Sequence, residues 1–82
     1  MTRQEINEKL NKIFQEVFDD NSITVNDSTS SKDIDDWDSL AHLTLVGSIE
    51  DEFGFKFTLG EINGFKNVGE MMNSIEKHLM NK

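Results

Sequence analysis

Residues 38–54 read DSLAHLTLVGSIEDEFG, and this stretch predicts a helix whose beginning and end are both marked. Asp38 is a favourable N-cap, because its carboxylate can accept from the free N–H groups of the first turn and suits the positive end of the helix dipole. Gly54 is well placed to end the helix, since glycine is common at helix C-termini. Apolar residues recur at helical spacing, and the face predicted to be buried consists of Leu40, Leu43, Val46, Ile49 and Phe53, flanked by Leu45.

A second helix is predicted near the start of the sequence, where Thr2 and Glu5 have the spacing of a capping box. The polar residues 19–22 end this helix, and a long polar loop follows to about residue 38. Ile23, Val25 and Ile34 are expected to attach this loop to the core. The apolar face of the helix consists of Ile6, Leu10, Ile13, Phe14, Val17 and Phe18.

Two further helices are predicted after Gly54. Thr58 with Glu61 repeats the capping-box spacing and opens a short helix, and Asn67 with Glu70 opens a longer last helix. Residues 55–57 alternate like a strand, but three residues without a partner cannot form a sheet, so they are predicted as loop. The apolar face of the last helix consists of Val68, Met71, Met72, Ile75 and Leu79.

Three longer helices and one short helix, without proline and without a repeat, predict an all-α four-helix bundle. We expect a single domain over residues 1–82 that is monomeric, with Met71, Met72 and the phenylalanines in its core. A domain of this size buries only roughly 60% of its unfolded surface. Little room therefore remains for a deep pocket.

The net charge of −8 is concentrated in the middle of the sequence. Residues 1–18 and 58–82 are each neutral, whereas residues 19–38 hold seven Asp against one Lys, or −6, and residues 39–57 hold three acids against one Lys, or −2. Nucleic-acid binding is not expected, because phosphate contacts need clustered Lys and Arg. Basic protein partners are expected instead.

Cysteine is absent, so no disulfide framework, zinc finger or thiol nucleophile can form. No apolar run approaches the ~18 residues that cross a bilayer, and the N-terminus lacks the apolar stretch of a signal peptide. The sequence therefore predicts a cytoplasmic protein without membrane insertion.

Ser39 follows the acidic stretch DIDDWD of residues 33–38 and stands at the first turn of the predicted helix. Its hydroxyl is expected to be exposed and held on a rigid element. A helix N-terminus favours a phosphate ester at this position, because free N–H groups and the helix dipole face the anion. The neighbouring carboxylates oppose an added anion, so the helix permits this modification without establishing it.

At this point the sequence resembles the acyl and peptidyl carrier proteins, whose hallmark is Asp-Ser-Leu at the start of the second helix, here Asp38, Ser39 and Leu40. The resemblance covers nearly the whole sequence and implies a four-helix, acyl-carrier-like bundle. It implies that a phosphopantetheinyl transferase moves 4′-phosphopantetheine from coenzyme A to Ser39, with Asp38 and Leu40 beside it. The arm supplies the thiol that the sequence lacks and carries an acyl group as a thioester. The resemblance therefore predicts a protein that is not an enzyme.

The resemblance also implies docking on acyl-loading and acyl-processing enzymes through basic patches of those partners. Complementary potentials raise encounter rates between such surfaces. The residues predicted to form the docking surface are Asp35, Asp36, Trp37, His42, Glu50 and Asp51.

Several residues depart from the pattern of fatty-acid carriers. The third position before the serine is commonly Gly and here is Asp36, which also occupies turns. The second and fifth positions after the serine are usually acidic but here are Ala41 and Thr44. Together with Trp37, these differences indicate a stand-alone carrier of a specialised pathway. The cargo stays open among fatty acyl, polyketide, aminoacyl and other acids.

The main alternative is a carrier-like acidic module that is never modified and binds a basic partner. A hydrolase nucleophile at Ser39 would need a Gly-x-Ser-x-Gly elbow and a held base, which the sequence lacks. A calcium loop that starts at Asp33 fails at its fifth, sixth and twelfth positions, which are Trp37, Asp38 and Thr44.

Two residues close to Ser39 in the sequence, Trp37 and His42, each have more than one possible role. His42 lies about one turn after Ser39 and is expected to be solvated or to face a partner rather than to act as a base. Trp37 is either a partner contact or a lid on the core.

Overall fold

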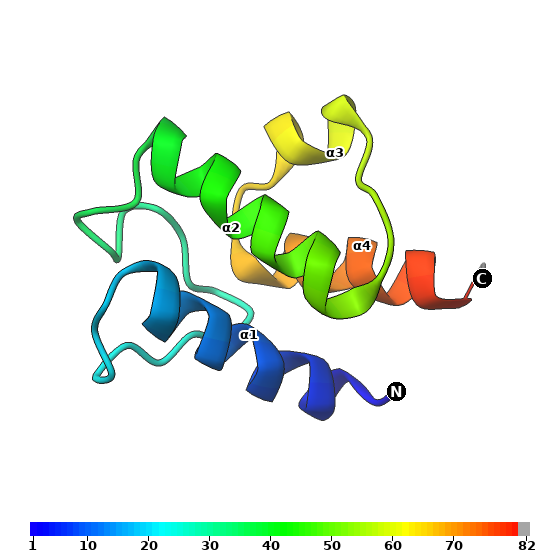
Figure 1. Cartoon of the computed structure of the whole chain (residues 1–82), viewed down its shortest axis with the longest axis horizontal. Helices are drawn as coiled ribbons and strands as arrows, with labels where there is room; N and C mark the ends of the chain where they lie inside the picture. The colour runs from blue at the N-terminus through cyan, green and yellow to red at the C-terminus, as the bar shows by residue number, and fades with distance from the viewer. Residues whose placement is uncertain (81–82) are drawn as a thin grey trace.

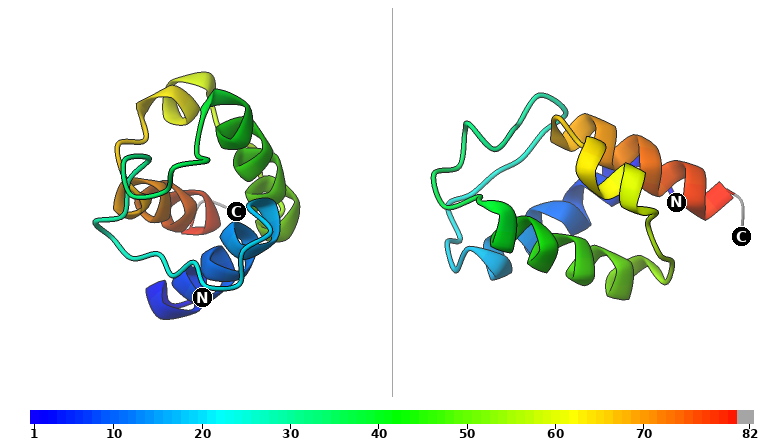
Figure 2. Two further views of the ribbon diagram at one scale, coloured as in Figure 1. Left: turned by 90° about the vertical axis from the view of Figure 1, so that its left-hand side faces the viewer. Right: turned by 90° about the horizontal axis from the view of Figure 1, so that it is seen from above.

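Four helices make up the computed structural model, which describes residues 1–80: α1 (Arg3–Val17), α2 (Ser39–Phe53), α3 (Leu59–Gly64) and α4 (Val68–Met80) (Figure 1). The described residues contain no strand, so the all-α prediction is confirmed. Helix α1 packs against α2 and α4. Helix α3 lies opposite α1, between α2 and α4 (Figure 2).

The predicted helix starts are formed by the expected side chains. Thr2 accepts a hydrogen bond from the Glu5 N–H at 3.1 Å, and the Glu5 carboxylate accepts one from the Thr2 N–H at 2.8 Å. Thr58 and Glu61 make the same reciprocal pair at 3.2 and 2.8 Å. At α4 the pair is altered, because the Glu70 carboxylate accepts from Lys66 instead of the capping residue. Local spacing thus predicted the helix starts correctly.

Helix α2 has the predicted ends but buries a different face. Asp38 accepts from the Ala41 N–H at 2.8 Å, and Gly54 ends the helix with a φ of 75°. Leu40 and Leu43, predicted to be buried, are 75% and 60% exposed. The prediction failed because His42 occupies the inward position of the first turns, in helical register with the buried residues Leu45, Val46, Ile49 and Phe53.

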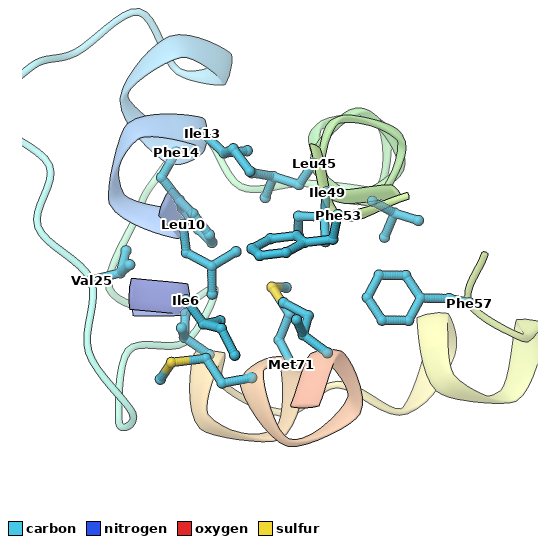
Figure 3. Packing of buried hydrophobic residues seen from close by; sticks show 14 residues of the cluster. Ile6, Leu10, Ile13, Phe14, Val25, Leu45, Ile49, Phe53, Phe57 and Met71 are labelled. Atoms are coloured by element: carbon cyan, nitrogen blue, oxygen red, sulfur yellow. The ribbon is translucent and has the colours of Figure 1, made fainter. Parts of the chain in front are cut away.

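The core lies where α1, α2 and α4 meet, and their apolar side chains point toward one another there (Figure 3). Val25 closes this core from the loop and Phe57 from the segment after α2. Phe14, Met71 and Met72 are fully buried, as predicted. The other residues of the core are Ile6, Leu10, Ile13, Leu45, Val46, Ile49, Phe53, Val68 and Ile75.

The long loop between α1 and α2 is tied to the start of α4. The N–H groups of Val68 and Gly69 donate to the carbonyl oxygens of Thr29 and Asp27 at 2.8 and 2.9 Å. These N–H groups have no partner within the helix, so the loop satisfies them. Val25 is buried in the core, which confirms its predicted anchoring role.

Within residues 1–80, no helix combines the length and apolar character needed to cross a membrane.

The close approach of the loop to α4 predicts opposite effects for two glycine substitutions. A Cβ at Gly69 would lie 2.8 Å from the Asp27 carbonyl oxygen, whereas a Cβ at Gly47, within α2, would meet nothing within 4 Å. We expect Gly69→Ala to lower the free energy of unfolding by about 1–3 kcal/mol. We expect Gly47→Ala to raise it by about 0.5–1 kcal/mol, because alanine is the better helix former.

Urea unfolding followed by circular dichroism measures both variants. A Gly69→Ala protein as stable as the wild type would show that the loop does not need its close contact with α4.

Candidate functional site

Ser39 is the first residue of α2, and its hydroxyl is free. Its side chain is exposed and makes no hydrogen bond or ion pair with any described residue. Asp38 provides the cap, since its carboxylate accepts from the Ala41 N–H. The turn before the helix is held by the backbone, with Trp37 N–H donating to the Ile34 carbonyl at 3.1 Å. A fixed helix start therefore presents an unengaged hydroxyl to solvent.

Trp37 is packed as a lid on the core, one of its two predicted roles. Its ring meets the Phe14 ring edge-on, with centroids 5.2 Å apart. The indole N–H donates to Nδ1 of His42 at 3.1 Å, so the polar end of the ring also has a partner inside the protein. Trp37 joins the loop before α2 to both α1 and α2.

His42 differs from its prediction as a solvated or partner-facing residue. The side chain is partly buried, with Nδ1 bound to Trp37 and Nε2 lying 2.8 Å from the Ile62 carbonyl oxygen of α3. Both ring nitrogens are therefore occupied by partners within the protein. His42 therefore connects α2 to α3, and its predicted role in docking stays a prediction.

A groove of about 470 Å³ opens beside Ser39. It lies between the start of α2 and the end of α3, and Lys66 is its only lysine or arginine. The sequence motif did not indicate the residues that α3 and the following segment contribute, because only the fold brings them to Ser39. The lining residues are Ser31, Trp37, Asp38, Ser39, His42, Leu43, Ile62, Asn63, Phe65 and Lys66.

The predicted acidic surface is divided by the fold. Asp35, Asp36 and Asp51 are exposed, although Asp51 lies about 18 Å along α2 from Ser39 at 1.5 Å per residue. Glu50 was predicted to face partners, but its side chain is only 13% exposed. Its carboxylate accepts from the Phe57 N–H at 2.8 Å and holds the segment after α2. The acidic surface near Ser39 therefore comes from the loop before α2.

Helix α3 is joined to α4 by a contact between the Glu61 carboxylate and the His78 ring. Nε2 of His78 lies 2.9 and 3.0 Å from the two carboxylate oxygens of Glu61, and the His78 ring stacks on Phe55 at 4.5 Å. Burial raises the pKa of Glu61, but the hydrogen bond from the Thr58 N–H and the contact with His78 outweigh this effect. They lower the pKa from 4.5 to about 2.

The surroundings of Ser39 fit a bulky group attached to its hydroxyl. The oxygen is exposed and without a partner among the described residues, and the adjoining groove offers space along α2 and α3. The first-turn N–H groups of α2 favour an anion at that point. A small helical bundle that presents such a serine has the features of a carrier modified covalently at one residue.

Comparison with known proteins identifies the family. A family model described as a phosphopantetheine attachment site matches residues 8–75, so the chain belongs to the phosphopantetheine-binding carrier family. The protein is thus a carrier and not a catalyst, and its predicted cofactor, 4′-phosphopantetheine, is confirmed as the group of the family. A comparison with curated proteins finds no match.

A solved structure with a similar fold supports this assignment. The solution structure of a holo acyl carrier protein from Geobacter metallireducens is 44% identical to this chain and superposes with a TM-score of 0.84. The match covers 90% of this chain and 85% of that protein. The predicted four-helix, acyl-carrier-like bundle is therefore confirmed.

The low pKa of Glu61 predicts how the stability of the fold depends on pH. Because the pKa is lower in the folded than in the unfolded protein, the ionised carboxylate stabilises the fold above pH 4.5, and this effect is lost as the pH falls toward 2. We expect Glu61→Gln to lower the free energy of unfolding by about 1 kcal/mol at pH 7. The difference from the wild type should disappear between pH 4.5 and 2.

Denaturant titrations across this pH range measure that difference. Glu16→Gln is the matched control, since the Glu16 side chain is exposed on α1 and binds no described residue. A loss of stability that is the same at pH 2 and pH 7 would contradict the role of the ionised carboxylate.

Proposed function

We propose that this protein is an acyl carrier protein that bears 4′-phosphopantetheine on Ser39 and presents acyl groups to partner enzymes. The observation that carries the proposal is the exposed, unpartnered hydroxyl of Ser39 at the first residue of α2, in the sequence Asp38-Ser39-Leu40. When bound, the arm supplies a terminal thiol that holds an acyl group as a thioester. The chain has no cysteine that could provide this thiol.

Ser39 is the nucleophile of the loading step. Its Oγ forms the new bond to phosphorus while the bond to the bridging oxygen of coenzyme A breaks, and adenosine 3′,5′-bisphosphate leaves. The hydroxyl proton passes to a base of the transferase, because none of the described side chains contacts Oγ. The carrier therefore contributes position and access, and the transferase contributes the chemistry.

The helix start offsets part of the repulsion between the new phosphodiester and the neighbouring aspartates. Asp38 is already engaged by the Ala41 N–H, and the positive end of the α2 dipole faces Ser39. Lys66 lines the same groove and makes no ion pair within residues 1–80. These groups favour a single anion at the hydroxyl despite the net negative charge of the chain.

Docking is proposed to use the exposed aspartates beside Ser39. Asp35 and Asp36 lie in the loop before α2, and Leu40 projects into solvent one residue after Ser39. A partner with a basic patch around a small apolar contact fits this surface. The transferase and the acyl-loading and acyl-processing enzymes are the proposed partners. Ala41 and Thr44 support a carrier whose partners differ from those of general fatty-acid synthesis.

Loading by a transferase tests the proposed attachment site. The protein is incubated with coenzyme A and a broad-specificity phosphopantetheinyl transferase, and its intact mass is measured. We expect the mass of one phosphopantetheine to be added to the wild type and none to Ser39→Ala. Ser31→Ala is the matched control, since Ser31 is an exposed serine of the same groove, and it should be loaded fully.

A folded wild type that stays unmodified would reject the carrier function. The protein would then fit better as an acidic module that binds a basic partner without modification.

Neutralising the two loop aspartates tests the docking surface. We expect Asp35→Asn with Asp36→Asn to lower the kcat/KM of loading about 3- to 10-fold at low salt, through KM, because long-range attraction to the transferase is reduced. The loss should shrink above about 0.1 M salt, where exposed charges are screened. Neutralising Glu8 and Glu16 on α1 changes the net charge equally and should have little effect. Equal effects of the two pairs would show that only net charge matters.

A further inference from the structure

Helix α3 has no fully buried residue, and it is held by the partly buried Ile62, which packs against the core, together with polar contacts to α2 and α4. The chain contains two histidines, and both of them contact this helix. His78 of α4 binds the Glu61 carboxylate, and His42 of α2 reaches the neighbouring Ile62 carbonyl oxygen at 2.8 Å. Helix α3, which forms one wall of the groove beside Ser39, is therefore bound to both α2 and α4. The contact nearer to Ser39 in sequence is that of His42.

The Ile62 carbonyl needs this partner. It lies in the last turn of α3, where carbonyl groups lack helical partners. The Lys66 N–H, four residues on, donates to Glu70 instead, at 3.2 Å. Because Nδ1 of His42 accepts from Trp37, the proton of the ring stands on Nε2 and is donated to Ile62. One tautomer thus satisfies both contacts and joins the loop, α2 and α3.

A chain tethered at Ser39 can lie in the open groove or pass deeper between α2 and α3, toward the core. The His42 ring stands in that space, with ring centroids 6.0 Å from Trp37 and 6.3 Å from Phe65. Further along the same face of α2, Leu45 and Ile49 are fully buried in the core. A close-packed interior accepts added methylene groups only if side chains move.

We propose that His42 determines the cargo of this carrier by closing the deeper space between α2 and α3, below the open groove. A chain attached at Ser39 then stays in the surface groove, in contact with water and with the polar residues Asn63 and Lys66. The protein accordingly carries short or polar acyl groups and does not shelter a long apolar chain. This inference rests on the proposed attachment at Ser39, and it adds the class of cargo.

The absence of cysteine permits a test that is independent of the transferase. Ser39→Cys has one thiol, which is alkylated with iodoacetamides that carry an N-alkyl chain of two or eight carbons. Thermal unfolding of each adduct is followed by circular dichroism, with His42 intact and with His42→Ala. With His42, we expect midpoints that agree within about 1 °C for the two adducts. With His42→Ala, the eight-carbon adduct should unfold about 5 °C above the two-carbon adduct, because the chain becomes buried.

Two controls separate His42 from a general loosening of α3. His42→Gln keeps a donor and an acceptor and should behave as His42 does. His78→Ala removes the contact of α3 with α4 and should lower both midpoints without a dependence on chain length. A length dependence in His78→Ala equal to that in His42→Ala would overturn the assignment to His42.

A measurement on the eight-carbon adduct with His42 intact decides the question without any His42 variant. Nuclear Overhauser contacts from the terminal methyl group to Leu43 and Phe65, or to no side chain, support the proposal. Contacts to Leu45, Ile49 or Met71 would reject it. Because the adduct forms by alkylation, these results are separate from the loading assay of Ser39.

Discussion

The carbonyl oxygens of Asp27 and Thr29 fix the long loop and the start of α4 at the same time. They accept the N–H groups of Gly69 and Val68, so two segments distant in sequence satisfy each other's backbone groups. Arg3 adds to this junction by binding the Asp27 carboxylate at 3.0 Å and the Gly69 carbonyl at 3.2 Å, which joins the start of α1 to it. The loop that ends at Ser39 is thereby held to the bundle far from Ser39 itself.

A series of ring contacts connects the long loop to the surroundings of Ser39. Trp37 meets Phe14 of α1 and stacks on His42 of α2, which in turn meets Phe65 after α3. Each ring comes from a different segment, and such aromatic pairs contribute about 0.5–1.5 kcal/mol beyond the area they bury. Ser39 stands two residues after Trp37. This small domain therefore positions its reactive residue through a row of rings that starts at the buried Phe14 and continues through the partly buried Trp37, His42 and Phe65.

Features of the structure that depend on neighbouring residues could be predicted from this sequence. Features that depend on contacts between distant residues could not. The N-cap Asp38 and the C-terminal Gly54 act on neighbouring backbone groups, so the bounds of α2 follow from spacing alone. The buried face of α2 was predicted in the wrong register because His42 points inward on that face. A polar residue such as histidine is not counted in an apolar pattern. Glu50 looked like a surface charge because its partner, the Phe57 N–H, comes near only once the next segment has folded. The groove beside Ser39 depends on the placement of α3, a short helix with no fully buried residue, whose Ile62 packs partly buried against the core and is too little to form a repeating apolar pattern.

Ser39 stays free because Asp38 performs the structural task that a serine often performs at the start of a helix. Serine is among the best N-caps, and a serine in that role commits its side-chain oxygen to a backbone N–H. Here the cap lies one residue earlier, and the Asp38 carboxylate takes the Ala41 N–H with the stronger, charge-assisted bond. The hydroxyl of Ser39 is left at the first helical position, exposed but fixed in place by the helix. If the cap were one residue later, the reactive oxygen would be bound to a backbone N–H. In this pair of neighbours, Asp38 caps the helix and Ser39 remains available for modification.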